Sequence, residues 1–198
     1  MNYLAHAYLS FNEPRILTGN MISDFVKGKK QFDYSNDVQK GIVLHRAIDN
    51  FTDEHPATKE AEEFFRKEYR LYSGPFVDIV YDHFLAKDKN EFKDEAALKK
   101  FSAESYAVLQ NNIELLPERF QRMFPYMKEQ DWFYNYQFED MIDKSFSGLA
   151  RRALYLKETK TAFKIFNDNY KSLQLCYDEF FPSVKKFAES KFHQLLAN

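Results

Sequence analysis

Apolar residues recur three and four positions apart along almost the whole chain, the spacing that places side chains on one face of a helix. The stretch containing Ala57, Ala61, Phe64, Phe65 and Tyr69 is an example. The alternation of apolar and polar residues that is typical of strands is scarce. The pattern therefore predicts an all-α fold, a single compact helical domain of about eight or nine helices covering residues 1–198. The predicted helices span residues 2–11, 14–28, 36–53, 57–72, 75–87, 92–114, 117–129, 138–157 and 159–192.

Few residues interrupt this pattern. The 198 residues include only 5 glycines and 6 prolines, whereas 21 phenylalanines and 13 tyrosines supply bulky side chains for a core. Pro14, Pro56, Pro75 and Pro117 stand near the starts of predicted helices, where the missing N–H of proline is not needed. Gly28, followed by two lysines, is expected to end the second helix in a left-handed conformation. The length and the absence of a linker-like stretch favour one domain.

Charge and hydropathy exclude several classes of partner. With 28 basic and 30 acidic residues the formal net charge is -2, so a nucleic-acid partner is not expected. No stretch has the length and apolarity of a membrane span, and the chain does not open with a signal-peptide pattern. The single cysteine, Cys176, fits a reducing compartment and is most simply a buried apolar residue. We therefore expect a cytoplasmic protein without a membrane partner, whose oligomeric state the sequence leaves open.

Histidines and aspartates stand inside apolar helical stretches in the first half of the chain. His45 and Asp49 are four residues apart and share a helix face, with Asp53 one turn further on. Burying several such groups together costs free energy unless a cation or substrate holds them, and mixed nitrogen and oxygen ligands suit Mn²⁺, Mg²⁺, Fe²⁺ or Zn²⁺. The sequence therefore predicts a divalent metal site. Its candidate ligands are His6, Asp24, His45, Asp49, Asp82 and His83.

Some of these residues also have simpler interpretations. His6 on the apolar side of a short first helix can be a core histidine bonded to a backbone carbonyl. Asp53, close to Pro56, can be a turn or capping residue. For the other candidates separate burial is the costlier explanation, because each polar group would need its own partners.

The order and spacing of four short motifs in the first 88 residues resemble those of the acyl carrier protein phosphodiesterase family. The remainder of the chain is similar mainly in length and in its helical, aromatic character. The motifs are Met1-Asn2-Tyr3-Leu4-Ala5-His6, Gly19-Asn20-Met21-Ile22-Ser23-Asp24-Phe25-Val26-Lys27-Gly28, Gly41-Ile42-Val43-Leu44-His45-Arg46-Ala47-Ile48-Asp49 with Thr52-Asp53, and Asp78-Ile79-Val80-Tyr81-Asp82-His83-Phe84-Leu85.

This resemblance implies a manganese-preferring bacterial enzyme that removes 4'-phosphopantetheine from holo acyl carrier protein and leaves the apo protein. It also implies a divergent relative of the HD phosphohydrolases, with an HD-phosphohydrolase-like helical core. The adjacent pair here reads Asp82-His83, the reverse of the usual order in that wider group. Ligands are therefore carried over only from the narrower family's own motifs.

Within this hypothesis a metal-activated water cleaves the phosphodiester. Arg46 and Lys27, each close to a candidate ligand, can neutralise phosphate charge, although surface salt bridging is the simpler role for both. Asp53 is a candidate general base. Three basic clusters can meet an acidic carrier protein, and three aromatic residues can line a groove for the pantetheine arm or pack in the core. The basic clusters are Lys27, Lys29 and Lys30; Arg66, Lys67 and Arg70; and Arg151 and Arg152; the aromatic residues are Trp132, Tyr134 and Tyr136.

Three other functions fit the same residues. The site can act on a nucleotide or another small phosphodiester, or the chain can be a non-catalytic module that binds carrier proteins. It can also be a helical interaction protein with structural histidines, in which case no stoichiometric metal would be found.

Overall fold

The computed structural model describes residues 1–153, 155–156 and 158–197. Within these residues the chain forms eleven α-helices and no strand, which confirms the predicted all-α fold. The helices are α1 (Tyr3–Tyr8), α2 (Pro14–Ile22), α3 (Asn36–Glu54), α4 (Pro56–Tyr69), α5 (Ser73–Lys87), α6 (Glu95–Asn111), α7 (Glu118–Glu129), α8 (Trp132–Asn135), α9 (Glu139–Arg152), α10 (Lys160–Asp168) and α11 (Tyr170–Leu196).

The helices outnumber those predicted for two reasons. The predicted helix 159–192 is divided at Asn169, whose side-chain amide donates to the carbonyl of Ile165 at 2.9 Å and closes the end of α10. The short helix α8 was not predicted; it follows Asp131, whose φ of 42° turns the chain. The predicted helix 138–157 is α9 and ends at Arg152, while residues 154 and 157 of that prediction lie outside the described part of the chain.

Four short 3-10 helices replace helix ends and part of a loop that the sequence predicted. The predicted helix 14–28 ends as an α-helix at Ile22, and the predicted loop 29–36 contains the second 3-10 helix. Gly28 does adopt the predicted left-handed conformation, with φ of 58°. The 3-10 helices are η1 (Ser23–Phe25), η2 (Gly28–Asp33), η3 (Arg70–Tyr72) and η4 (Ile113–Leu115).

Two glycines allow α2 and α3 to cross in backbone contact. A Cβ atom on Gly19 would lie 2.1 Å from the carbonyl oxygen of Val38, and one on Gly41 would lie 2.3 Å from that of Ile16. Any other residue at either position would push the helices apart. This crossing brings the end of α2 against the middle of α3, where the polar candidate ligands lie.

Helix α5 runs through the centre of the domain and packs against α1, α4, α9 and α11. It is buried on nearly all sides, as expected for a helix that is apolar all round. Around it the core is largely aromatic. Phe76 of α5 stacks on Phe65 of α4 at 5.5 Å between ring centroids and meets Phe146 of α9 edge-on at 4.7 Å.

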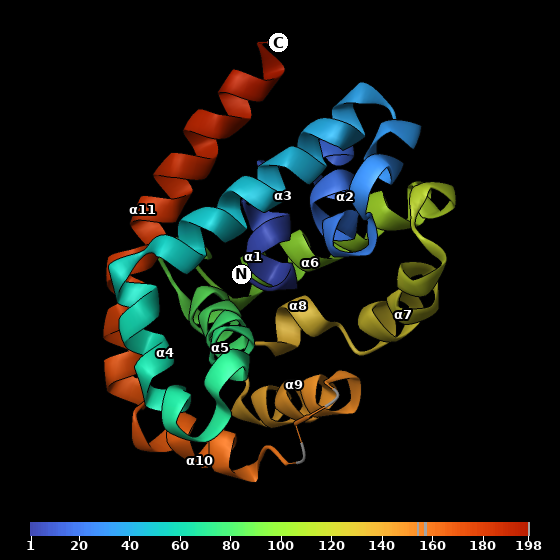
Figure 1. Cartoon of the computed structure of the whole chain (residues 1–198). Coiled ribbons are helices and arrows are strands. Elements are labelled where there is room, and N and C mark those ends of the chain that lie inside the picture. The colour runs from blue at the N-terminus through green and yellow to red at the C-terminus, as the bar shows by residue number, and fades with distance from the viewer. Residues whose placement is uncertain (154, 157, 198) are drawn as a thin grey trace.

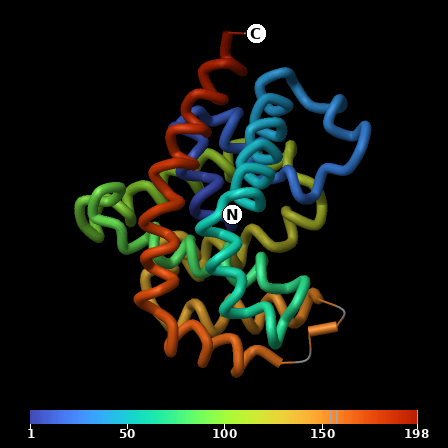
Figure 2. The backbone as a smooth tube through the Cα atoms, turned by 60° about the vertical axis from the view of Figure 1, so that its left-hand side comes forward, coloured from blue at the N-terminus to red at the C-terminus, as the bar shows by residue number. Residues whose placement is uncertain are grey.

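The long helix α11 lies along one side of the molecule and packs against α3 and α4 (Figures 1 and 2). The N-terminal helix α1 lies near the middle, between α5 and the α2–α3 pair, with α7, α8 and α9 forming a separate side (Figure 1). No helix in the described part of the chain is both long and apolar enough to cross a membrane. The start of α1 lies between the α2–α3 pair on one side and α8 and α9 on the other.

Candidate metal centre

Two imidazole rings from different helices stack face to face beside one carboxylate. His6 of α1 and His45 of α3 are both buried, and their ring centroids lie 3.8 Å apart with the ring planes inclined by 16°. Nε2 of His6 lies 3.1 Å from Oδ1 of Asp49, and Nε2 of His45 lies 3.0 Å from Oδ2. Asp49 stands four residues after His45 on the same helix face, as the spacing predicted. Its carboxylate therefore bridges the two rings.

Asn20 fixes the orientation of the His45 ring. Its side-chain amide nitrogen donates to the carbonyl of His6 at 2.9 Å and to the hydroxyl of Ser10 at 3.0 Å. The amide oxygen must therefore accept from the Nδ1–H of His45, at 3.2 Å. In neutral His45 the lone pair is consequently on Nε2, the atom that faces the carboxylates.

Asp24 adds a second carboxylate at the open side of this group. Its Oδ1 lies 3.2 Å from Nε2 of His45, while its side chain is 69% exposed. Asp24 belongs to η1, directly after the end of α2, so the α2–α3 crossing places it beside His45. The hydrogen bond from His45 lowers the pKa of Asp24.

The protonation of the group follows from its geometry. Burial opposes a charge on His45, but its hydrogen bonds to Asp24 and Asp49 outweigh burial and raise its pKa to about 9. Burial and the neighbouring His45 lower the pKa of His6. Burial also opposes ionisation of Asp49, yet His6 and His45 hold its pKa well below the usual range. Without a metal, a positive charge on His45 therefore offsets part of the negative charge of Asp24 and Asp49.

The donor atoms fit a divalent cation. One ligand atom each from His6, His45 and Asp49 can be chosen so that all three lie within 4.8 Å of one another. A cavity of about 20 Å³ lies beside His6, His45 and Asp24, which is room for about one water molecule or ion. Nδ1 of His6 is buried and has no hydrogen-bond partner among the described residues. Imidazole nitrogens with carboxylate oxygens suit a divalent metal and do not by themselves select one.

The structure does not bring Asp82 and His83 to this cluster. Asp82, in the middle of α5, accepts the backbone N–H groups of Leu4 at 2.8 Å and Ala5 at 3.0 Å, and thus caps the start of α1. His83 is fully buried, and its ring nitrogens lie 2.7 Å from the carbonyl of Tyr136 and 2.9 Å from the hydroxyl of Tyr170. Both nitrogens are thus engaged away from the cluster.

The three candidate catalytic residues lie around the rim. Arg46 is exposed and donates to Gln31 at 2.6 Å and to the carbonyl of Val26 at 3.1 Å, so it fastens the η1–η2 segment. Lys27 is exposed three residues beyond Asp24. Asp53 is exposed one turn beyond Asp49, and burial together with Asp78 raises its pKa. Within the described residues, none of the three forms a hydrogen bond or an ion pair with the side chains of His6, His45 or Asp49.

A further group near the cluster had no signal in the sequence pattern. The amino group of Met1 donates to Asp78 at 2.8 Å and lies 3.6 Å from Oδ1 of Asp49. Burial opposes its charge, but Asp78 and Asp49 raise its pKa to about 10. It supplies a positive charge beside Asp49 from a backbone atom, which residue spacing cannot indicate.

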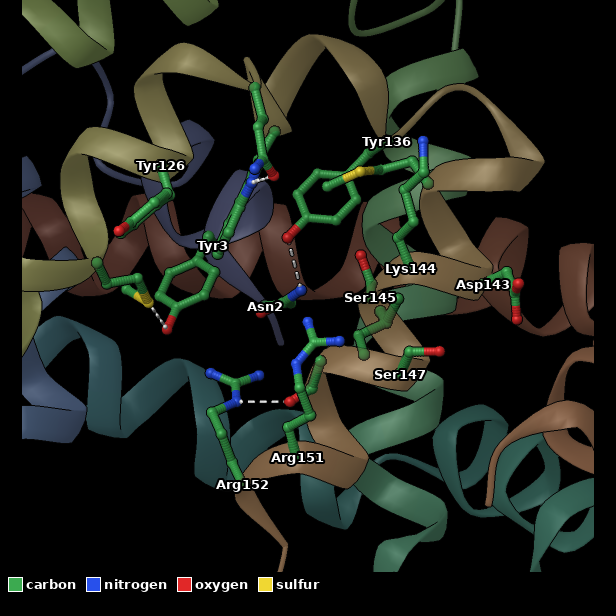
Figure 3. Close-up of a pocket in the computed structure, with 16 residues that line it drawn as sticks. Asn2, Tyr3, Tyr126, Tyr136, Asp143, Lys144, Ser145, Ser147, Arg151 and Arg152 are labelled. Atoms are coloured by element: carbon green, nitrogen blue, oxygen red, sulfur yellow. Dashed lines mark hydrogen bonds between the residues drawn. The ribbon is translucent and has the colours of Figure 1, made fainter. Parts of the chain in front are cut away.

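The aromatic and arginine candidates separate into two places. Trp132, Tyr136, Arg151 and Arg152 line a cavity of about 830 Å³ beside the start of α1 (Figure 3). Tyr134 lies outside it, where its hydroxyl donates to Glu95 at 3.3 Å and Lys99 lies over its ring.

The helical fold and the histidine–carboxylate group define a helical protein with a candidate metal centre. Residues 1–184 match the acyl carrier protein phosphodiesterase family, and the chain belongs to that family. Relatives named acyl carrier protein phosphodiesterase share 30% identity in Yersinia enterocolitica and 31% in an Enterobacter species, each over 96% of this chain and 99% of the relative. The relative of that name in Photorhabdus laumondii shares 30% identity over 96% of both chains. No solved structure matches.

Proposed function

We propose that this chain hydrolyses the phosphodiester that links 4'-phosphopantetheine to a serine of holo acyl carrier protein. The family and the names of the relatives support this substrate. The observation that supports the chemistry is the convergence of His6, His45 and Asp49 beside a cavity of about 20 Å³. Water adds to phosphorus and the P–O bond to the serine breaks. The products are 4'-phosphopantetheine and the apo protein with a free seryl hydroxyl.

In this proposal His6, His45 and Asp49 hold a divalent cation, most simply Mn²⁺ as the family resemblance implies, with Mg²⁺, Fe²⁺ and Zn²⁺ as alternatives. Such an ion, when bound, lowers the pKa of a water molecule and polarises a phosphoryl oxygen. Asn20 keeps Nε2 of His45 free for this purpose by accepting from Nδ1–H. We do not include Asp82 and His83 among the ligands, because backbone groups and a tyrosine already occupy their polar atoms.

Asp24 is the residue best placed to handle protons in this reaction. It is the most exposed carboxylate that contacts the cluster, and its Oδ1 reaches to 3.2 Å from Nε2 of His45. An ionised carboxylate at the solvent side can accept a proton from the attacking water. Asp53, which the sequence suggested for this role, lies a full helical turn further along α3 from His45 than Asp49 does.

The carrier protein needs a docking surface, and acyl carrier proteins are acidic. Lys27, Lys29 and Lys30 are exposed on the segment that follows Asp24, and within the described residues none of them forms an ion pair. By contrast, Arg66 already pairs with Glu62 at 3.0 Å and with Glu63 at 2.8 Å. We therefore assign docking to the three lysines, which can attract an acidic helix to the mouth of the site.

Intact-protein mass spectrometry of holo acyl carrier protein tests the proposal. We expect loss of the phosphopantetheine mass with manganese and wild-type enzyme, and no loss with a chelator or with His45→Ala. Unchanged substrate in the presence of metal-loaded wild-type enzyme would exclude the carrier protein as substrate and favour another phosphodiester. Cleavage that survives both the chelator and His45→Ala would exclude the metal centre.

A further inference from the structure

A cavity of about 830 Å³ opens between the start of α1 and helices α7, α8 and α9 (Figure 3). Its volume lies within the range of roughly 300–1,000 Å³ that is usual for small-molecule sites. Neither the metal cluster nor the lysine surface uses it. Its neighbourhood, charge and lining each bear on what it binds.

The cavity adjoins the metal centre. Asn2 and Tyr3 line both this cavity and the smaller one beside His6 and His45. Tyr3 precedes His6 by about one helical turn on α1. Asn2 is held in place by its hydrogen bond to the hydroxyl of Tyr136, at 3.0 Å. A ligand at this end of the large cavity would therefore contact side chains that also border the cluster.

Two guanidinium groups face the cavity without a carboxylate partner in the described residues. Arg151 and Arg152 end α9 and reach toward Asn2 and Tyr3 (Figure 3). Nε of Arg152 donates to the carbonyl of Gly148 at 3.2 Å, which leaves its terminal nitrogens for other partners. Lys144 on the same wall is different, because it pairs with Asp140 at 2.7 Å. An anionic group at the α1 end of the cavity would thus meet two arginines.

The phenol of Tyr3 lies between this charge and the metal centre. Burial raises the pKa of Tyr3, and Arg152 opposes this effect while Asp24 adds to it. The charges of Arg152 in the large cavity and of Asp24 at the cluster therefore both act on the phenol of Tyr3. An anion beside Tyr3 would lie within the influence of both.

The rest of the lining is mixed in character. Ile79, Met123 and Met141 offer apolar surface, and Ser145 and Ser147 offer hydroxyl groups. Pantetheine is a chain in which methyl and methylene groups alternate with two amides and a hydroxyl, so it needs both kinds of contact. A phosphate at one end of such a chain matches the position of the arginines.

We propose that this cavity binds the 4'-phosphopantetheine arm, with its phosphate beside Tyr3 and Arg152 and its pantetheine chain along α8 and α9. This inference rests on the proposed function for the identity of the ligand. It gives Arg151 and Arg152 contact with the prosthetic group, in place of the docking contact with the carrier protein that the sequence suggested. It also makes the enzyme selective for phosphodiesters that carry a long flexible arm.

Calorimetric titration of free 4'-phosphopantetheine and of pantetheine into the manganese-loaded protein tests the proposal without any cleavage. Wild-type protein should bind the phosphorylated compound more tightly. Arg152→Ala should weaken its binding about 10- to 100-fold and leave pantetheine binding almost unchanged, because charged hydrogen bonds to phosphate are lost. Arg122→Ala is the matched control, since Arg122 is exposed on α7, pairs with Glu118 and does not line the cavity.

A second experiment fills the cavity with a larger side chain. Ser145→Phe should weaken both compounds and raise KM for holo acyl carrier protein at least about tenfold, whereas Ser145→Ala removes the hydroxyl without filling space and should change KM little. Melting temperature and metal content of each variant show whether it remains folded and loaded.

These measurements separate the inference from the proposed function. If wild-type enzyme cleaves holo acyl carrier protein but Arg152→Ala and Ser145→Phe bind free 4'-phosphopantetheine like wild type, the cavity is not the arm site and the function stands. If Arg152→Ala impairs only cleavage of the carrier protein, the arginines dock protein and the inference is wrong. If wild type cleaves nothing yet binds 4'-phosphopantetheine in a manner that depends on Arg152, the arm site stands and the proposed hydrolysis fails.

Discussion

Two buried groups in this molecule contain the same residue types and are built in opposite ways. In the metal centre, His6, His45 and Asp49 contact mainly one another, and a small cavity remains beside them. In the middle of α5, Asp82 and His83 contact backbone atoms of α1 and of the residue after α8, and a tyrosine of α11. The first group is completed by a proton or a cation. The second is already complete and joins helices.

This difference shows that burial and residue type alone do not identify a ligand. A buried histidine is available to a metal when its acceptor nitrogen faces other ionisable side chains and a space. It is structural when both nitrogens have neutral hydrogen-bond partners. The two groups should therefore respond differently to substitution, to pH and to metal, and each response tests the distinction.

The largest difference should appear in activity. His45→Ala should reduce hydrolysis of holo acyl carrier protein by more than about 100-fold and release the metal, because loss of outer-shell partners alone typically costs 10- to 100-fold. His83→Gln should retain its metal and most of its activity at a temperature well below its midpoint of unfolding. Metal content by elemental analysis and initial rates check both. Retained metal in His45→Ala, or lost metal in folded His83→Gln, would reverse the assignment of the two groups.

The next largest effect concerns stability. Asp82→Ala should lower the free energy of unfolding by about 2–4 kcal/mol, because the N–H groups of Leu4 and Ala5 lose their buried acceptor. Denaturant unfolding with and without manganese measures this loss. Asp24→Ala is the comparison in the metal centre: it should cost the metal-free protein less than Asp82→Ala, since its side chain is largely exposed and loses only its contact with His45. Equal losses for the two variants would remove the proposed capping role of Asp82.

The sequence placed much of the first group together and gave no sign of the hydrogen bonds that engage the second. The proximity of His45 and Asp49 could be predicted, because residues four apart in one helix lie on the same face. The approach of Asn20 to His45 could not be predicted, because it depends on Gly19 and Gly41, which let α2 and α3 touch. The approach of His6 depends on how α1 packs against the other helices. Asp82 and His83 have the same residue types, but they are adjacent in the sequence, and their partners are two N–H groups of α1, the carbonyl of Tyr136 and the hydroxyl of Tyr170.

The fold shows the same limit. Apolar periodicity predicted the helices around α5 and missed the division at Asn169, which depends on one side chain that bonds to the backbone. It also missed α8. The cavity between α1 and α9 likewise has no motif, because its walls come from five helices, α1, α5, α7, α8 and α9. The sequence showed Arg151 and Arg152 as a basic cluster, but it could not show that they face Asn2 and Tyr3.

His45 and His83 should also make the stability of the metal-free protein depend on pH in opposite directions. The folded pKa of His45 is raised from 6.5 to about 9, so its contribution is fully present below pH 6.5 and is lost as pH rises through 9. Burial lowers the folded pKa of His83 to about 4, so the unfolded chain binds more protons between pH 6.5 and 4 and stability falls as pH falls. Each histidine should change the free energy of unfolding by on the order of 1–3 kcal/mol over its pH range.

Urea unfolding of chelator-treated protein from pH 5 to pH 9 measures both slopes. His45→Gln should flatten the alkaline decline, and His83→Gln should flatten the acidic one. Saturating manganese should reverse the alkaline trend, because binding requires neutral imidazoles and the metal replaces the proton. The two histidines would prove equivalent if one substitution flattened both limbs.

The smallest effect isolates how the ring of His45 is held. Asn20→Ala removes the acceptor for Nδ1–H and leaves all the proposed ligands in place, so manganese affinity should fall about tenfold, the usual cost of losing an outer-shell partner. Competition with a fluorescent chelator measures the affinity. Thr18 of the same helix serves as the control, because its hydroxyl donates to the carbonyl of Pro14, away from His45, and Thr18→Ala should leave manganese affinity unchanged. Equal affinity in the wild type and Asn20→Ala would mean that the stacking on His6 and the contact with Asp49 orient His45 without Asn20, and the metal centre would then depend on α1 and α3 alone.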